Sequence, residues 1–180
     1  GICLTDHDYF WDPRNICSLG QRHNFLVLPG AEITTEEGHV LVFGLDRYVF
    51  GMHRASFLHR LTTQQGAVMI AAHPYRRRQL LTLVNQPAGL DDAIDQTCQE
   101  KLFSFCHAIE VVNGRGSHLE NGFSRAICER LGLRGVGGSD SHRSEHLGTA
   151  CTHFHHRISS IEDLVRELKV GRYEPTDNPP

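Results

Sequence analysis

The stretch AVMIAAHPYR at residues 67–76 decides how the rest of the chain is interpreted. It is an unbroken apolar run that ends at His73, and Pro74 then stops a strand because proline has no amide hydrogen to donate. A short apolar run bounded in this way is typical of a buried β-strand. We predict a strand over residues 68–72 that delivers His73 to its carboxyl end. His73 is then either a metal ligand or a core histidine satisfied by one hydrogen bond.

Apolar and β-branched runs of the same kind recur along the chain, at residues 2–5, 25–28, 39–45, 109–113, 135–138 and 150–154. Between them, residues 54–65, 90–101, 119–131 and 161–170 carry apolar side chains at helical spacing. Gly132 and Gly171 are suited to end the last two helices. Strands that alternate with helices indicate an α/β domain with a mainly parallel sheet.

Most of the predicted strands run directly into polar side chains that can bind metals. These side chains are Asp6, His7, Asp8, Glu32, His73, Asn113, Asp140 and His142. Functional groups gathered at the carboxyl ends of several strands favour a β/α barrel. A doubly wound sheet would concentrate them at one or two crevice loops. Because the chain has 180 residues, fewer than the roughly 200–250 of most such barrels, we expect a small or incomplete one.

The composition is that of an ordinary globular domain, with 39% hydrophobic and 22% charged residues. The formal net charge of −3 argues against general binding to nucleic acid or membrane surfaces, and no apolar run is long enough to span a membrane. The six cysteines form no CxxC motif, so we expect a reducing, cytoplasmic setting. The unusual feature is 13 histidines, the commonest metal-binding side chain.

Single motifs leave alternatives open. The sequence DHD at residues 6–8 could be a solvated turn, and Glu32 could be a surface carboxylate. His39 opens a strand seven residues after Glu32, so a hairpin could bring the two together, and ligand and surface roles are equally open. Asp140 and His142 are two residues apart and can point the same way from an extended chain. We interpret His153 and His155 as the polar outer face of a late strand.

A set of three or more histidine and carboxylate ligands suits zinc, manganese or iron better than calcium. Such ions lower the pKa of a bound water and supply hydroxide for attack. Arginines follow two of the predicted strand ends, at residues 76–78 and at Arg115. Guanidinium groups there would bind phosphate, although a solvated basic loop is an equal alternative.

Taken together, these stretches resemble the polymerase and histidinol phosphatase (PHP) family. The phosphoesterase branch, which includes nucleoside-bisphosphate and oligoribonucleotide phosphatases, is the most similar. The matching stretches are LTDHD (4–8), LPGAEIT (28–34), GHVL (38–41), AHPYR (72–76), IEVVNGR (109–115) and GSDSH (138–142), followed by LG at 147–148.

The resemblance implies a small, distorted β/α barrel of about seven strands. It also implies two or three divalent ions at the strand ends. Its motifs make ligands of five residues, with Glu32 bridging two ions: His7, Glu32, His73, Asp140 and His142. His39 matches a ligand position that varies within the family. The resemblance assigns metal ligands only; the expectation that Arg76 and Arg115 bind a second anionic group of the substrate comes from their position after strand ends.

The chain departs from the family pattern at its start. The family begins with a strand that ends in a His-x-His pair, and no segment here has that form. We therefore expect a PHP-like domain over residues 1–172 that lacks its first strand and holds fewer than three ions, followed by a flexible tail at 173–180. An open barrel edge exposes unpaired backbone groups, so we expect either self-association through that edge or low stability.

The expected function is metal-dependent hydrolysis of phosphate esters by metal-bound hydroxide. The expected substrate is a phosphorylated small molecule or short nucleic acid, of nucleotide, nucleoside-bisphosphate or oligonucleotide type, and no membrane is involved. The alternative is a degenerate, catalytically weak barrel that binds metal as a structural or binding module. A third possibility is a zinc amidohydrolase, which can have a similar barrel and similar histidine and aspartate ligands. Such an enzyme usually needs a lysine that bridges its metal ions, and neither Lys101 nor Lys169 follows a predicted strand.

Overall fold

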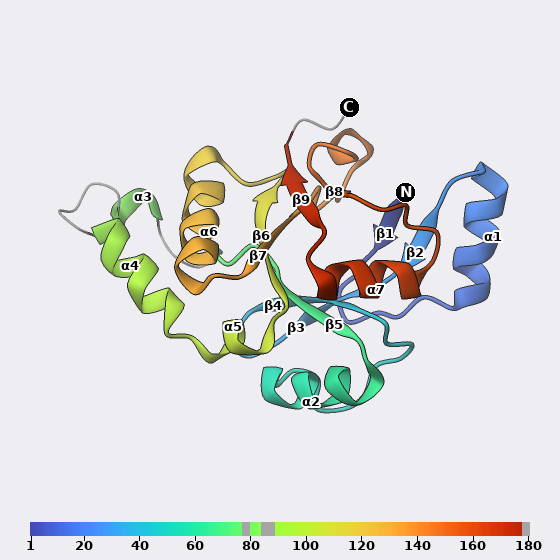
Figure 1. Ribbon diagram of the computed structural model, residues 1–180, viewed down its shortest axis with the longest axis horizontal. Helices are drawn as coiled ribbons and strands as arrows, with labels where there is room; N and C mark the ends of the chain where they lie inside the picture. The colour runs from blue at the N-terminus through green and yellow to red at the C-terminus, as the bar shows by residue number, and fades with distance from the viewer. Residues whose placement is uncertain (77–79, 84–88, 178–180) are drawn as a thin grey trace.

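A computed structural model describes residues 1–76, 80–83 and 89–177. It has mixed α/β architecture (Figure 1). The elements in chain order are β1 (Ile2–Leu4), α1 (Pro13–His23), β2 (Val27–Pro29), β3 (Ala31–Thr34), β4 (His39–Phe43), α2 (Ala55–Gln65), β5 (Val68–Ala71), α3 (Leu80–Leu83), α4 (Gly89–Cys98), α5 (Lys101–Phe105), β6 (Ala108–Asn113), α6 (His118–Leu131), β7 (Arg134–Gly138), a 3-10 turn (Ser144–His146), β8 (Cys151–Phe154), α7 (Ile161–Val170) and β9 (Tyr173–Thr176).

The central sheet has five strands in the order β3-β4-β5-β6-β7. β5, β6 and β7 are parallel, but β3 and β5 both pair antiparallel with β4. The prediction of a mainly parallel sheet is therefore wrong for the first half. The reason is the short connection at residues 35–38, because a parallel pair needs a crossover of a dozen or more residues. Thr35 closes this turn by donating its backbone N–H to the Gly38 carbonyl, at 2.9 Å.

The sequence predicts a small, incomplete β/α barrel, and the described residues do not form a closed barrel. β1 pairs with β2, and β8 with β9, in separate two-stranded sheets. β8 contacts β7 through a side chain. The Thr152 hydroxyl accepts a hydrogen bond from the Gly137 N–H at 3.0 Å and donates one to the Gly137 carbonyl at 2.9 Å. The expected flexible tail is also wrong for residues 173–176, which form β9 and bury Tyr173.

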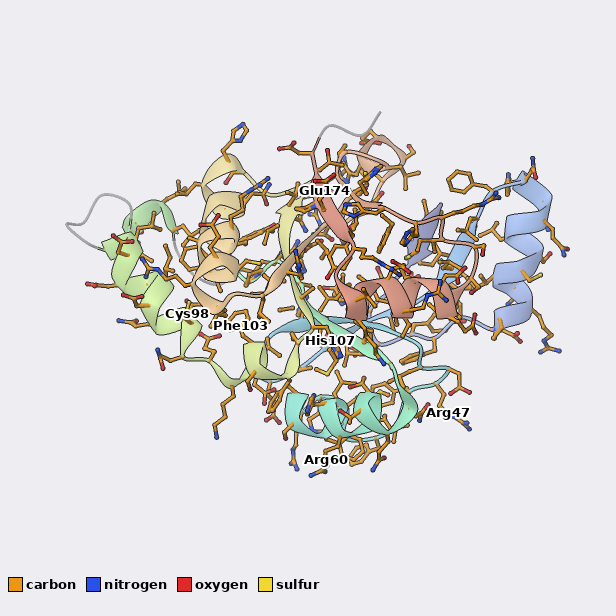
Figure 2. The ribbon with its side chains drawn as sticks, viewed as in Figure 1. Arg47, Arg60, Cys98, Phe103, His107 and Glu174 are labelled. Carbon is orange, nitrogen blue, oxygen red and sulfur yellow. The ribbon has the colours of Figure 1, made fainter. Side chains whose placement is uncertain are left out.

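The sheet buries an apolar core on each face, and β5 shows the alternation that strands impose. Met69 and Ala71 join the first core with side chains from α2, α5 and α6. Val68 and Ile70 join the second core, which α7 covers. In Figure 1, α7 lies across the strands and α2 lies below them. Figure 2 shows Arg60 on the outer side of α2, where its guanidinium stacks over the Phe57 ring.

The helix ends follow local sequence signals. α6 begins with a capping box, in which Ser117 accepts from the Glu120 N–H and the Glu120 carboxylate accepts from the Ser117 N–H. Gly132 and Gly171 end α6 and α7 in the left-handed conformation, as predicted. The helix predicted over 90–101 corresponds to α4, which ends earlier, at Cys98, and a separate short helix, α5, begins at Lys101. No helix within the described residues is long and apolar enough to cross a membrane.

Candidate metal centre

Strand alternation brings Glu32 and His39 to one face of the sheet. Ala31 and Ile33 point into the first core, so Glu32 between them points to the opposite face. His39 precedes Val40, which is also in the first core, and therefore shares the face of Glu32. The β3–β4 register places Glu32 opposite Leu41 and His39 opposite Thr34. The two side chains are thus diagonal neighbours across the hairpin.

Three imidazole rings surround the buried Glu32 carboxylate. His39 Nδ1 lies 2.7 Å and His73 Nε2 lies 3.0 Å from Glu32 Oε1, while His7 Nε2 lies 3.9 Å from Oε2. The His39 ring is 5.1 Å, centroid to centroid, from each of the other two rings. One ligand atom from each of His7, Glu32 and His39 fits within 4.8 Å of the others. These four residues are called the Glu32 cluster below.

His7 reaches this cluster because residues 6–8 pair in parallel with β3. The Glu32 N–H donates to the Asp6 carbonyl at 3.1 Å, and the Asp8 N–H donates to the Glu32 carbonyl at 2.9 Å. Asp8 Oδ1 also accepts from the Thr34 N–H at 3.1 Å. The DHD stretch is therefore fixed along the strand, and only one of its three side chains joins the cluster.

The pKa shifts in the Glu32 cluster favour the protonation states that bind a cation. Burial raises the pKa of Glu32, but hydrogen bonding and charge from His73, with smaller contributions from His7 and His39, lower it overall to about 2. Burial lowers the pKa of His39, which favours the neutral imidazole. A charged carboxylate beside neutral imidazole nitrogen is the form in which these groups bind metals.

Backbone strain is concentrated at this site. Four non-glycine residues among those described have positive φ, and three of them belong to the stretches that deliver the site: Asp8 (52°), His73 (29°) and Asp140 (47°). Such conformations cost about 1–3 kcal/mol each and persist where the surrounding structure holds them. At His73 the left-handed conformation also ends the alternation of β5, so the ring can turn to Glu32.

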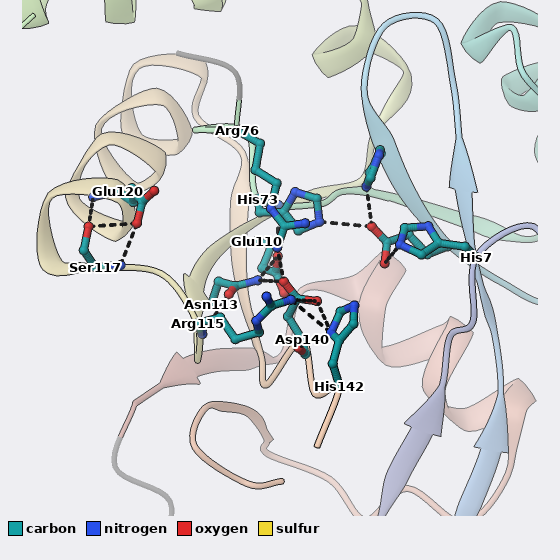
Figure 3. A network of polar contacts seen from close by, with 12 residues as sticks. His7, His73, Arg76, Glu110, Asn113, Arg115, Ser117, Glu120, Asp140 and His142 are labelled. Atoms are coloured by element: carbon teal, nitrogen blue, oxygen red, sulfur yellow. Dashed lines mark hydrogen bonds and ion pairs between the residues drawn. The ribbon is translucent and has the colours of Figure 1, made fainter. Parts of the chain in front are cut away.

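Asp140 lies in a second group of polar residues next to the Glu32 cluster (Figure 3). Its buried carboxylate is hydrogen-bonded by Arg76 and lies 3.3 Å from Asn113 Nδ2 and 3.7 Å from an Arg115 guanidinium nitrogen. His142 Nδ1 is 3.5 Å from Asp140 Oδ1 and 3.0 Å from the Arg115 guanidinium. We call these five residues the Asp140 group.

The sequence-predicted residues thus lie in two adjoining sets. His7, Glu32, His39 and His73 come together, whereas Asp140 and His142 contact the two arginines expected to bind substrate. The neighbouring Arg77 and Arg78 lie outside the described residues. His153 and His155 are exposed on and just after β8.

Sequence reasoning missed Glu110, a buried carboxylate in β6. It accepts from the His73 backbone N–H at 2.9 Å and from Asn113 Nδ2 at 3.0 Å. Burial raises the pKa of Glu110 to about 7, although His73 and these hydrogen bonds oppose the shift. The available signal was a single charged residue in the otherwise apolar run of residues 108–112.

The donor chemistry of the Glu32 cluster fits a divalent transition metal. Imidazole and carboxylate together suit zinc, manganese and iron, and the ligand atoms already converge without a lysine or arginine among them. Asp140 would add a second carboxylate only where Arg76 and Arg115 turn away from it. The arrangement can therefore hold a cation beside a pair of guanidinium groups.

Part of this chain matches a known family model, and its fold is similar to that of several solved structures. Residues 118–173, from α6 to the start of β9, match a family model described as PHP-associated. A two-domain protein from Bacteroides vulgatus containing a predicted PHP-like metal-dependent phosphoesterase is similar in structure, with a TM-score of 0.62 and 19% identity over 97% of this chain and 55% of that chain. A candidate metal-dependent phosphoesterase from Bifidobacterium adolescentis has a TM-score of 0.52 and 16% identity, over 95% and 86% of the two chains.

PsfC from Pseudomonas syringae is also similar, with a TM-score of 0.57 and 21% identity over 84% of this chain and 59% of that one. The chain thus spans 59% of PsfC and 55% of the Bacteroides protein. No curated protein matches the chain. The chain therefore matches a PHP-associated family model over residues 118–173 and has a fold similar to that of two proteins named as metal-dependent phosphoesterases.

Proposed function

We propose that this domain hydrolyses phosphate esters with the help of divalent metal ions. The observation that carries the proposal is the Glu32 cluster, in which a buried, charged carboxylate meets three imidazoles. The guanidinium groups of Arg76 and Arg115 lie in the adjoining Asp140 group. Two proteins of similar fold carry names that include metal-dependent phosphoesterase, which supports the same chemistry.

His7, Glu32 and His39 would hold a metal ion, with His73 beside them. A divalent ion bound there supplies Lewis-acid chemistry, because it lowers the pKa of a water and neutralises charge on phosphoryl oxygens. Zinc, manganese and iron are the candidates that this donor set favours. Glu32 supplies negative charge and orients His39 and His73 through Oε1.

Arg76 and Arg115 would bind a second anionic group of the substrate. Their side chains are 36% and 38% exposed, whereas the Asp140 carboxylate that they share is 7% exposed. Both guanidinium groups can therefore exchange part of their contact with Asp140 for a phosphate oxygen, which they bind in a bidentate manner. This arrangement favours substrates with more than one phosphate, such as nucleoside bisphosphates or short oligonucleotides.

The proposal is tested by assaying the purified chain with Mn²⁺ on p-nitrophenyl phosphate and on a nucleoside bisphosphate. We expect Glu32→Gln to abolish turnover of both esters. Arg76→Ala and Arg115→Ala should raise KM for the bisphosphate more than for the monophosphate. Arg60→Ala, on the outer side of α2, is the matched control and should change neither the turnover nor the KM of either ester.

Two results would contradict the proposal. Turnover that survives Glu32→Gln would place the reaction outside the Glu32 cluster. Metal binding without turnover of any ester would favour the alternative, a domain that keeps the cation as a structural or binding element.

A further inference from the structure

Glu110 lies between the two halves of the site without belonging to either. The residue is buried, with 4% of its surface exposed. Its Oε2 accepts hydrogen bonds from both the His73 backbone N–H and the Asn113 side-chain amide. Figure 3 shows its carboxylate near the centre of the polar network. Both of these donors are uncharged, so hydrogen bonds rather than an ion pair hold the group.

A β-bulge in β6 explains why Asn113 shares the face of Glu110. Glu110 pairs with Val136 and Val112 with Gly137, so Val111 is an extra residue between them. Val111 and Val112 consequently both pack into the first core. Glu110 and Asn113 are thereby left on the opposite face, although strict alternation would separate residues three apart. Bulges often re-aim side chains next to active sites.

The neighbouring strand leaves room for this carboxylate. Gly138 pairs with Asn113 across the β6–β7 ladder. A Cβ atom at Gly138 would lie 2.7 Å from Glu110 Oε1, closer than side chains tolerate. The Glu110 carboxylate can therefore occupy this position only because residue 138 is a glycine.

Each of the two hydrogen bonds leads to one half of the site. The bond from the His73 N–H holds a backbone with φ of 29°, and the ring of that residue contacts Glu32. The bond from Asn113 fixes an amide that also lies 3.3 Å from Asp140 Oδ2. One carboxylate oxygen thus connects the Glu32 cluster to the Asp140 group.

We propose that Glu110 is a positioning residue that holds His73 and, through Asn113, Asp140 in the arrangement that binds metal and substrate. This inference rests on the proposed function, because it assumes a metal at the Glu32 cluster. The length of the Glu110 side chain and the position of its acceptor oxygen determine this role, and its negative charge does not. Partners that orient metal ligands typically change metal affinity or activity by about 10–100-fold when removed.

Three variants distinguish the effect of side-chain length from the effect of charge. Glu110→Gln keeps the length and an acceptor oxygen but removes the charge. Glu110→Asp keeps the charge but is one methylene shorter, and Glu110→Ala removes both. We expect Mn²⁺ affinity within about threefold of wild type for Gln, and a loss of about 10–100-fold for Asp and Ala.

The experiment is a titration of the full chain with Mn²⁺, followed by calorimetry or electron paramagnetic resonance, together with thermal unfolding of each variant. Glu167→Ala is the matched control, because Glu167 is another buried carboxylate with hydrogen bonds, located in α7 and bound by Arg172. It should lower thermal stability without changing Mn²⁺ affinity. Should Glu110→Ala fail to fold, the comparison of Asp with Gln still decides the question.

Each possible outcome has a distinct meaning. If Asp retains affinity while Gln loses it, charge or direct ligation is what matters, and the positioning role is wrong. Equal affinity in all the Glu110 variants and wild type would overturn this inference while leaving the proposed function intact. A wild-type chain that binds no Mn²⁺ would overturn both.

Discussion

Gly138→Ala tests whether the space beside Glu110 is as restricted as the structure indicates. The added Cβ would lie 2.7 Å from Glu110 Oε1, while ordinary van der Waals contact begins at 3.4 Å. The difference, 3.4 − 2.7 = 0.7 Å, is the distance by which the two atoms must separate. Gly138 is not among the glycines with positive φ, so the contact with Glu110, rather than backbone strain, dominates the effect.

The carboxylate has little freedom to make this movement. Its other oxygen accepts two hydrogen bonds, at 2.9 Å from His73 and 3.0 Å from Asn113. Overpacking a core typically costs about 1–3 kcal/mol. For a domain of this size, each kcal/mol lowers the melting temperature by about 2–4 °C. We therefore expect Gly138→Ala to melt about 2–12 °C below wild type, a range that follows from multiplying these two values.

Thermal and urea unfolding followed by circular dichroism measure the change, and Gly122→Ala is the matched control. A Cβ atom at Gly122 meets nothing within 4 Å, and the residue lies inside α6. Alanine there should raise stability by about 0.5–1 kcal/mol, because glycine is unfavourable in a helix. A Gly138→Ala protein as stable as Gly122→Ala would refute the close packing of Glu110 against β7.

Two further predictions concern stability away from the metal centre. Hydrogen bonding by Arg172 lowers the pKa of Glu167 although burial opposes the shift, so its contribution is present above the unfolded value of about 4.3 and is lost as pH falls through the lower folded value. Glu167→Gln should therefore be less stable than wild type at pH 7, and urea unfolding should show the difference shrinking in acid; a constant difference would contradict this. Ser117→Ala removes half of the capping box of α6 and should lower the unfolding free energy by about 0.5–2 kcal/mol, and an unchanged urea midpoint would show that the cap contributes nothing.

Sequence reasoning found Glu32 but not the strand that carries it. The strand predicted over residues 25–28 ends before Pro29 and Gly30, because proline followed by glycine usually marks a turn. In the structure Gly30 instead allows a close approach, since a Cβ there would lie 2.6 Å from the Phe43 ring. This contact between β4 and the β2–β3 junction has no signal within the local sequence.

Other differences have similarly local causes. β9 contains Pro175, a residue that strands tolerate mainly at sheet edges, and its sequence YEPT offers no apolar alternation. α1 buries only Ile16, so it contains too few apolar residues for an apolar helical face to be recognised in the sequence. By contrast, α7 has a strongly one-sided apolar pattern, and its predicted bounds, residues 161–170, are confirmed.

The candidate site was predictable where side chains directly follow strands, as His73 and Asp140 do. It was not predictable where a backbone irregularity redirects a side chain. The bulge at Val111 brings Glu110 and Asn113 to the same face, and a three-residue spacing in a strand predicts the opposite. The separation of Asp140 from the Glu32 cluster likewise depends on contacts with Arg76 and Arg115 that are distant in sequence.

The most direct test of the central claim is the metal content of the purified chain. Wild type, Glu32→Gln and His73→Ala would each be loaded with Mn²⁺ or Zn²⁺, dialysed and measured by elemental analysis, with Glu167→Gln as a control of similar burial. We predict at least one ion per wild-type and control chain, and a sharp loss in both site variants because each removes a group of the Glu32 cluster. Unchanged metal content in Glu32→Gln and His73→Ala would contradict the assignment of this cluster as a metal centre.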